Sequence, residues 1–159
     1  MLRPSVTAPL PDLLAAAAHA NTADLYFLPH LLGERSPHWN ASARGAFLGL
    51  ARHHGPAELT RAVLEGVAFN LATCVSAFRE AELAVDRVDA IGGGAVSDLC
   101  AAVTTAVAVG LVPGFAVARD LSQVSAEFTP DPGHADYTHR HARVTDAYRR
   151  LEPWFADNG

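Results

Sequence analysis

The clearest structural pattern in the sequence runs from Gly45 to Phe69, GAFLGLARHHGPAELTRAVLEGVAF. Its first six residues are small or apolar and predict a short strand, with Gly45 and Gly49 placed where another backbone can pass close. Beyond them, apolar residues recur at steps of three and four, which predicts one long amphipathic helix over residues 56–81. A short strand that leads into a long helix indicates an α/β fold.

The helix expected over residues 56–81 has a clear start and more than one packed side. Pro56 suits the first helical position, and Glu58 complements the positive end of the helix dipole. Leu64, Ala68 and Phe69 add a second apolar side, so we expect packing on more than one face. The main stripe consists of Leu59, Ala62, Val63, Gly66, Val67, Asn70, Leu71, Cys74, Val75 and Phe78.

Three segments precede the quoted stretch. Residues 11–20, PDLLAAAAHA, are rich in helix formers and begin with Pro and Asp, which predicts a short helix. Residues 25–28, LYFL, are apolar and are closed by Pro29, which predicts a buried strand. Residues 31–45, LLGERSPHWNASARG, follow no period of 2 or 3.6, so we expect a loop held by its side chains.

Downstream of the long helix, the sequence predicts a strand that ends in glycines. Residues 85–91 alternate and run into Gly92, Gly93 and Gly94. Residues 99–109, rich in Ala, Val and Thr, fit a helix or a strand, and the helix is preferred. The charged residues 134–151 predict a solvated terminal helix that closes at Pro153 and Trp154. The side chains expected to pack from it are Tyr137, His141, Val144, Tyr148 and Leu151.

Composition sets the class of the protein. The chain has 159 residues, 50% of them hydrophobic, which is enough for one domain with a real core. Its net charge is −5, with 12 Lys and Arg against 17 Asp and Glu and no basic run, so nucleic acid is not an expected partner. There is no clean leader and no apolar run of roughly 20 residues, so we expect a cytoplasmic protein without a membrane partner.

The cysteines and histidines show no metal-binding pattern. Cys74 and Cys100 lie far apart with no CxxC pair, which favours two buried reduced thiols. Four histidines between residues 30 and 54 include no i, i+4 pair with a supporting carboxylate. We therefore expect no metal held by protein side chains.

A few charged residues are candidates for structural roles near a cleft. Glu34 and Arg35 fit a mutual ion pair or a brace for the loop, and a structural role is favoured over catalysis. Arg44 fits a contact with an anion across a cleft or, equally simply, an anchor for the loop. A buried Glu65 needs a partner, and a hydrogen bond from the helix to a loop is the favoured one.

The glycine turn is the candidate ligand site. Gly92, Gly93 and Gly94 lack side chains, so the turn can adopt positive φ and bring backbone amides close to a bound molecule. Taken alone, three glycines after a strand are more often an ordinary turn.

Four blocks together resemble the FGGY family of carbohydrate kinases. GERSPHWN, ARGAFLGL, RAVLEGVAF and AIGGGAVS occur in that family's order and approximate spacing. Residues 45–65 are similar to its C-terminal signature, in which Gly45, Gly49 and Glu65 are motif positions. GERSPHWN resembles the GERTPH-type loop of the xylulokinase branch.

The resemblance implies a fold and an activity. The fold is a ribonuclease-H-like, actin-like ATPase domain, an α/β sheet flanked by helices. The activity is phosphorylation of a ketose, D-xylulose first, with ATP as donor and Mg²⁺ carried by the nucleotide. By the same resemblance, Gly92, Gly93 and Gly94 contact the nucleotide, and Ser97 and Asp98 lie near its adenine end.

Residues 1–159 are expected to form a single partial C-terminal domain of such a kinase. The family's N-terminal domain supplies the catalytic aspartate and much of the sugar site, so no catalytic residue is assigned here. GGGAVS is followed after three residues by AAVTTAVAVGL, which looks like a later helix of the family. A helix-plus-strand unit of roughly 20–30 residues is therefore expected to be deleted after about residue 100.

These expectations leave three hypotheses about the function open. The first is a kinase fragment that binds nucleotide, and in the complete site a sugar, but is inactive alone. The second is a non-catalytic remnant that acts as a binding or oligomerisation module. The third is a split enzyme whose N-terminal kinase half is another chain. Apolar surface left by missing parts predicts self-association.

Overall fold

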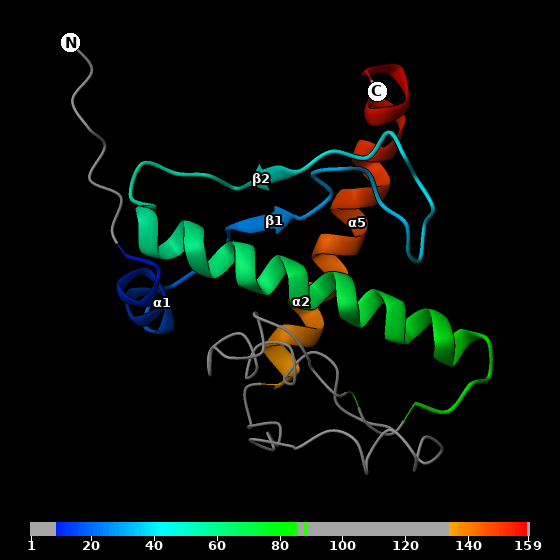
Figure 1. Cartoon of the computed structure of the whole chain (residues 1–159), viewed down its shortest axis with the longest axis horizontal. Coiled ribbons are helices and arrows are strands. Elements are labelled where there is room, and N and C mark those ends of the chain that lie inside the picture. Colours follow the sequence, from blue (N-terminus) through cyan, green and yellow to red (C-terminus); the bar gives the residue numbers. More distant parts are fainter. Residues whose placement is uncertain (1–8, 86–87, 89–133, 159) are drawn as a thin grey trace.

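The computed structural model describes residues 9–85, 88 and 134–158. The predicted glycine turn and the predicted helix at 99–109 lie outside these residues, as does most of the predicted strand at 85–91. Figure 1 shows the arrangement of the elements. They are α1 (Leu10–Ala18), β1 (Tyr26–Leu28), β2 (Ala46–Leu48), α2 (Pro56–Glu80) and α5 (His134–Asn158).

The two predicted strands pair with each other. β1 and β2 are antiparallel, with Tyr26 opposite Leu48 and Leu28 opposite Ala46. In the middle of the pair the rings of Phe27 and Phe47 lie 4.6 Å apart, a favourable cross-strand aromatic contact. All three residues of β1 are buried, as predicted, whereas β2 is only partly covered.

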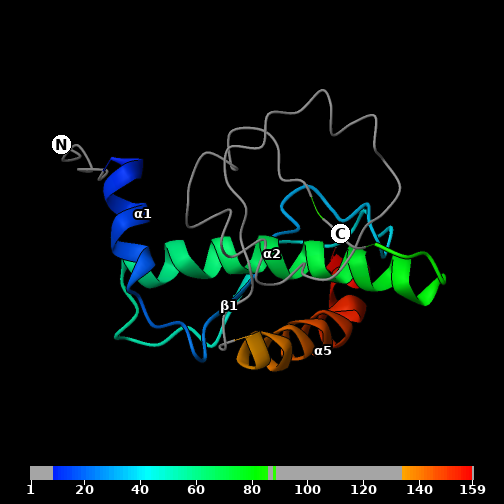
Figure 2. The same cartoon turned by 90° about the horizontal axis from the view of Figure 1, so that it is seen from below.

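The long helix α2 organises the described part of the chain. The helix begins at Pro56, as the sequence predicts, and the Glu58 carboxylate also accepts a hydrogen bond from the backbone N–H of Gly55 at 2.9 Å. α1 packs beside the first turns of α2, and α5 crosses its middle (Figures 1 and 2). β1 also contacts α2, so the predicted packing on more than one face is confirmed.

The close approach of α2 to β1 requires a glycine. A Cβ on Gly66 would collide with the backbone carbonyl oxygen of Phe27. This glycine therefore sets how near the helix lies to the strand.

By length and composition alone, α2 would suffice to cross a membrane. The core helices of many water-soluble proteins meet the same criterion. In this fold α2 carries buried side chains against α1, β1 and α5.

Side chains from both faces of β1 fill the core, because neighbouring residues of a strand point to opposite sides. Leu25 and Phe27 lie on one side with Ala62. Tyr26 and Leu28 lie on the other side in a larger cluster. The remaining buried members of that cluster are Ala43, Phe69, Val144, Tyr148 and Phe155.

The terminal helix is longer than the sequence predicts. We expected α5 to close at Pro153, but it continues to Asn158. Proline inside a helix removes a hydrogen bond and costs about 3 kcal/mol. The continuation places Phe155, which is 1% exposed, in the core, and this burial offsets most of that cost. The predicted packing positions Val144 and Tyr148 are buried.

The prediction for Cys74 was partly wrong. It is a free thiol, as expected, but it is half-buried and not fully buried. Its Sγ donates to the carbonyl oxygen of Ser36 at 3.3 Å, so it links α2 to the loop. Cys100 lies outside the residues that the structure describes.

Candidate functional site

The structure describes about half of the predicted site residues. Gly92, Gly93, Gly94, Ser97 and Asp98 lie outside the described ranges, so their nucleotide role remains a prediction. The other six belong to two separate sets of contacts. Glu65 lies on α2. The other five lie in the loop between β1 and β2 or directly after β2: Glu34, Arg35, Arg44, Gly45 and Gly49.

Glu65 is the centre of a buried polar network. It is 1% exposed, and its carboxylate accepts hydrogen bonds from Thr22 Oγ1 at 2.7 Å and from Arg140 Nη2 at 2.7 Å. Arg61 Nε donates to its other oxygen at 2.9 Å. The predicted bond from the helix to a loop is present, since Thr22 belongs to the loop between α1 and β1. The two arginines add an ion-pair network that the sequence did not predict.

The network joins α2, α5 and the loop after α1. Arg140 Nη2 also donates to the backbone oxygen of Thr22 at 2.8 Å, and Arg61 Nη2 donates to the hydroxyl of Tyr137 at 2.8 Å. The Arg140 guanidinium lies 5.6–5.8 Å from the ring centres of Tyr26, Phe69 and Tyr137. Its Nε is buried without a hydrogen-bond partner. Stacking on aromatic rings is a favourable environment for such a cation.

Electrostatics keep both arginines charged. Burial lowers the pKa of Arg61 and of Arg140, but hydrogen bonds to Glu65 and its negative charge outweigh burial, so both pKa values are raised. The Glu65 oxygens are occupied by donors from three different elements. Such a carboxylate is a structural group and is poorly suited to take a proton from a substrate.

The sequence offered a signal for only part of this network. Arg61 precedes Glu65 by four positions on the helix, the spacing at which oppositely charged side chains meet. Arg140 lies 75 positions away on α5, and only the fold brings it to Glu65.

The loop between β1 and β2 is held by its own side chains, as predicted. The backbones of Glu34 and Asn40 exchange hydrogen bonds at 2.8 and 2.7 Å. The Glu34 side chain accepts a bond from the backbone N–H of His38 at 2.9 Å, which makes Glu34 the brace of the loop. Arg35 is exposed. Of the two predicted roles for Glu34, the structure therefore shows the brace.

Arg44 and the glycines beside it fix the end of the loop. Arg44 Nη1 donates to the backbone oxygens of Ala41 and Ala43 at 3.0 and 2.9 Å, so the loop-anchor role is confirmed. Gly49 has φ +78°, and a Cβ there would collide with the carbonyl oxygen of Asp24. A Cβ on Gly45 would lie 3.3 Å from a β1 carbonyl oxygen. Both glycines permit the close backbone approach that the sequence predicts.

The loop is fastened to α5 through Tyr148. Asn40 Nδ2 donates to the Tyr148 hydroxyl at 3.1 Å. The ring of His38 stacks on Tyr148 with centres 4.4 Å apart, and His30 meets it edge-on at 5.2 Å. Burial of Tyr148 raises the pKa of its hydroxyl despite the Asn40 bond.

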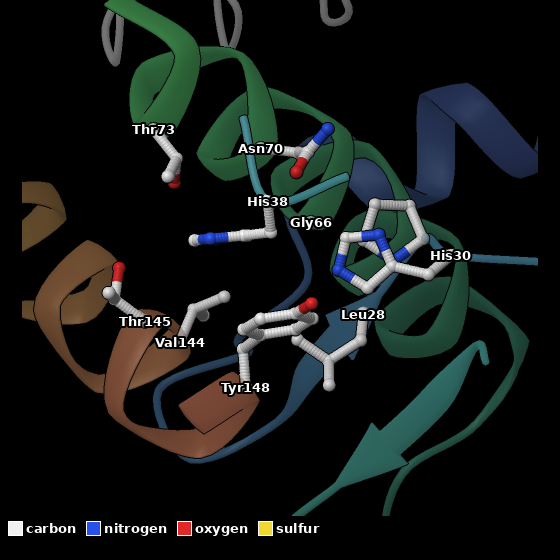
Figure 3. Close-up of a pocket in the computed structure, with 10 residues that line it drawn as sticks. Leu28, His30, His38, Gly66, Asn70, Thr73, Val144, Thr145 and Tyr148 are labelled. Atoms are coloured by element: carbon white, nitrogen blue, oxygen red, sulfur yellow. The ribbon is translucent and has the colours of Figure 1, made fainter. Parts of the chain in front are cut away.

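A small cavity lies where this loop, α2 and α5 meet (Figure 3). His30, His38, Thr73 and Tyr148 are among its polar walls, and its volume is about 20 Å³. This is room for one water molecule, and not for a sugar or a nucleotide. Burial lowers the pKa of His30, which is only 6% exposed.

A larger groove of about 600 Å³ opens between α5 and the strand pair. Its volume would suit a small molecule. Three of its charged side chains, however, contact other groups at the surface: Arg150 pairs with Asp146 at 2.7 Å, and Arg143 lies 6.0 Å from the ring centre of Tyr26. Within the described ranges, no three His, Cys, Asp or Glu side chains gather as metal ligands.

Comparison with known proteins gives a consistent family. Residues 3–112 match the C-terminal domain of the FGGY family of carbohydrate kinases. Xylulose kinase from Klebsiella pneumoniae is 46% identical over 89 residues, 55% of this chain. Gluconate kinase from Lactobacillus acidophilus matches 94% of this chain with a TM-score of 0.77 and 27% identity. Xylulose kinase from Rhodospirillum rubrum matches 92% with a TM-score of 0.74 and 26% identity.

The chain is much shorter than these proteins. It spans 18% of the Klebsiella pneumoniae xylulose kinase and 36% of the Lactobacillus acidophilus gluconate kinase. The structural likeness confirms the predicted fold class, a partial α/β domain of the ribonuclease-H-like, actin-like type.

Proposed function

The chain belongs to the FGGY family of carbohydrate kinases, and from this premise we propose that it supplies the nucleotide side of the cleft in an ATP-dependent ketose kinase. D-xylulose is the proposed sugar. The observation that carries this choice is the 46% identity to a xylulose kinase over 89 residues. The GERSPHWN loop, residues 33–40, supports the same choice through its similarity to the xylulokinase loop.

In this proposal the glycine turn binds the nucleotide. The amides of Gly92, Gly93 and Gly94 approach the phosphates, and Ser97 and Asp98 lie toward the adenine. Mg²⁺ arrives with the nucleotide and neutralises charge on the transferred phosphoryl group. The Glu65 network contributes by holding α2, the helix that precedes the turn in the sequence, against α5 and the α1–β1 loop.

Nucleotide titration tests the binding role directly. Calorimetry on the purified chain should show weak binding of ATP and ADP, which Gly93→Val abolishes. Gly55→Val is the matched control, because Gly55 has extended backbone angles and its Cβ would have an ordinary contact at 3.4 Å. A folded chain that binds neither nucleotide would refute the nucleotide role and favour the second candidate.

Phosphoryl transfer is proposed for a complete kinase and not for this chain alone. A base near the sugar hydroxyl is needed as well as a nucleotide site, and this chain spans only 18% of the similar xylulose kinase. A coupled assay of the purified chain with ATP and D-xylulose should detect no ADP formation. Turnover by the purified chain would overturn this expectation.

The second candidate is a non-catalytic remnant that serves as a binding or oligomerisation module. The deletion of a helix-plus-strand unit that the sequence predicts after about residue 100 favours it. A neighbouring reading frame that encodes the aspartate-bearing half would instead favour a split kinase. Gluconate should be assayed beside D-xylulose in any assembled enzyme, because the structural likeness extends to a gluconate kinase.

A further inference from the structure

The loop between β1 and β2, residues 29–45, meets α5 at a small set of polar and aromatic side chains. We call this set the loop junction, and it consists of His30, His38, Asn40 and Tyr148. The Asn40 amide donates to the Tyr148 hydroxyl at 3.1 Å. The ring centres of His38 and His30 lie 4.4 and 5.2 Å from that of Tyr148. Imidazoles change charge near neutral pH, so this loop is held to α5 partly by groups that titrate.

His30 lies in the interior of the loop junction. It is 6% exposed and lines the small cavity of about 20 Å³ (Figure 3). Within the ranges that the structure describes, no group hydrogen-bonds to its ring. A proton on this ring would therefore bring a positive charge to a place that only one water molecule can reach. A charge buried in this way is costly.

The charged groups around His30 do not offset this cost. On the loop, Glu34 attracts a proton to His30, but its carboxylate already accepts a hydrogen bond from the backbone N–H of His38. A positive charge on His38 repels such a proton. On α5, Glu152 acts on the Tyr148 hydroxyl. Burial has the largest effect and lowers the pKa of His30. The cavity walls from α2 and α5 carry no charge, and they are Gly66, Asn70, Thr73, Val144, Thr145 and Tyr148.

We infer that the loop junction is sensitive to acid and that protonation of His30 releases the loop from α5. The inference goes beyond the proposed function and does not depend on it. In the released loop His30 is in water and has the ordinary pKa of 6.5, whereas in the closed loop its pKa is lower. As pH falls through 6.5, the released form takes up a proton that the closed form does not, so the equilibrium shifts toward release. Above pH 6.5 both forms have a neutral His30 and the effect is absent.

The backbone of the loop favours release once the loop junction weakens. Trp39 has φ +52°, a left-handed conformation that is unfavourable for a bulky residue. Its side chain is 81% exposed, so it does little to hold the loop in place. The backbones of Glu34 and Asn40 enclose this residue with their mutual hydrogen bonds, and Asn40 is in turn bonded to Tyr148. Loss of the contacts to Tyr148 therefore allows the strain at Trp39 to relax.

Amide hydrogen exchange followed by mass spectrometry tests the inference on the whole chain. The measured quantity is protection, the exchange rate of an unstructured chain divided by the observed rate at the same pH. Protection of the loop should fall about tenfold between pH 7.5 and 5.5, the change expected for a group of pKa 6.5 that is protonated only in the released form. Protection in α2 should change by less than about threefold. Suitable probes are loop amides that donate within the loop, on Glu34, His38, Asn40, Ser42 and Ala43.

Three variants separate the titration of His30 from the other contacts of the loop. His30→Gln keeps a polar side chain that does not titrate, and it should remove the tenfold change. His53→Gln is the matched control, an exposed histidine outside the loop, and it should leave the change intact. Tyr148→Phe removes the hydrogen-bond partner of Asn40, so it should lower loop protection at both pH values and preserve the ratio between them.

A titration by nuclear magnetic resonance tests the same inference without a substitution at His30. The His30 ring signals should titrate with a midpoint below 6.5 in the wild-type chain and close to 6.5 in Tyr148→Ala, in which the loop is released. A wild-type midpoint at or above 6.5 would overturn the inference. Loop protection that does not depend on pH, or that still falls tenfold in His30→Gln, would also overturn it. An equal fall in α2 would show unfolding of the whole chain in place of release of the loop.

Discussion

Glu65 is surrounded by groups that come from distant parts of the chain. Thr22, Arg61 and Arg140 all donate to its carboxylate, which is 1% exposed. The sequence predicted that this residue needs a partner, because a buried carboxylate without one is costly. The identity of the main partner was not predictable, since Arg140 reaches it only through the packing of α5 on α2.

Removing the Glu65 charge should strongly destabilise the fold. Glu65→Gln leaves the buried guanidinium of Arg140 and the partly buried one of Arg61 without a counter-ion, and breaking a buried pair in this way costs about 3–5 kcal/mol. Urea unfolding followed by circular dichroism measures the loss. Asp146→Asn removes the acid of the exposed pair with Arg150 and should cost less than about 1 kcal/mol. Similar losses for both variants would contradict the assigned role of the network.

The buried His30 and the half-buried His141 should make the fold less stable in mild acid. Burial lowers the pKa of His30 and of His141 below the ordinary value of 6.5. As pH falls through 6.5, the unfolded chain therefore takes up protons that the folded chain does not, and stability decreases. Above pH 6.5 both histidines are neutral in the unfolded chain as well, so their burial no longer lowers the stability of the fold. We expect the Tm to fall by a few degrees between pH 7.5 and 5.5.

A double variant isolates this histidine effect. His30 faces Glu34, His38 and Tyr148, while His141 Nε2 lies 2.9 Å from Thr73 Oγ1 and its ring stacks on Phe69. His30→Gln with His141→Gln removes both titrating groups and should flatten the Tm profile between pH 7.5 and 5.5. An unchanged slope in that variant would assign the acid sensitivity to other groups.

At the level of helices and strands, the hydrophobic period and the residues typical of helix and strand ends predicted most of the described fold. The helices α1 and α2 and the strands β1 and β2 appear where the period and the turn residues place them. The predicted end of α5 was wrong. Pro153 is a local signal for the end of a helix, but the helix continues because Phe155 becomes buried in the core, which is a tertiary effect. The pairing of β1 with β2 also depends on tertiary contacts, since each has only three residues.

A substitution at Gly66 tests how closely α2 must approach β1. Gly66→Ala should gain up to about 1 kcal/mol of helix propensity. Its Cβ, however, collides with the carbonyl of Phe27, and overpacking costs about 1–3 kcal/mol, so we expect net destabilisation. Gly55→Ala, at the open start of the same helix, should change stability by less than about 1 kcal/mol. A more stable Gly66→Ala protein in thermal melts would show that α2 can move away from β1.

At the scale of the whole molecule, α5 completes a core that the first half of the chain begins. Val144, Tyr148 and Phe155 fill the same cluster as Tyr26 and Leu28. A chain shortened to residues 1–133 should therefore lose cooperative unfolding and its near-ultraviolet circular dichroism. Removing only residues 157–159 should preserve both. Cooperative unfolding of the 1–133 chain would show that α5 is dispensable.

The contact between Arg140 and Thr22 joins positions 118 apart, with the backbone oxygen of Thr22 only 2.8 Å from the guanidinium. This hydrogen bond joins a residue that precedes the interval 86–133 in the sequence to a residue that follows it. Doubling or halving the length of a closed loop changes its closure entropy by only about 0.6 kcal/mol. The loss of roughly 20–30 residues that the sequence predicts there would therefore change the free energy of closing this contact by only a small amount. The contact between Arg140 and Thr22 is therefore expected to tolerate a change in the number of residues in this interval.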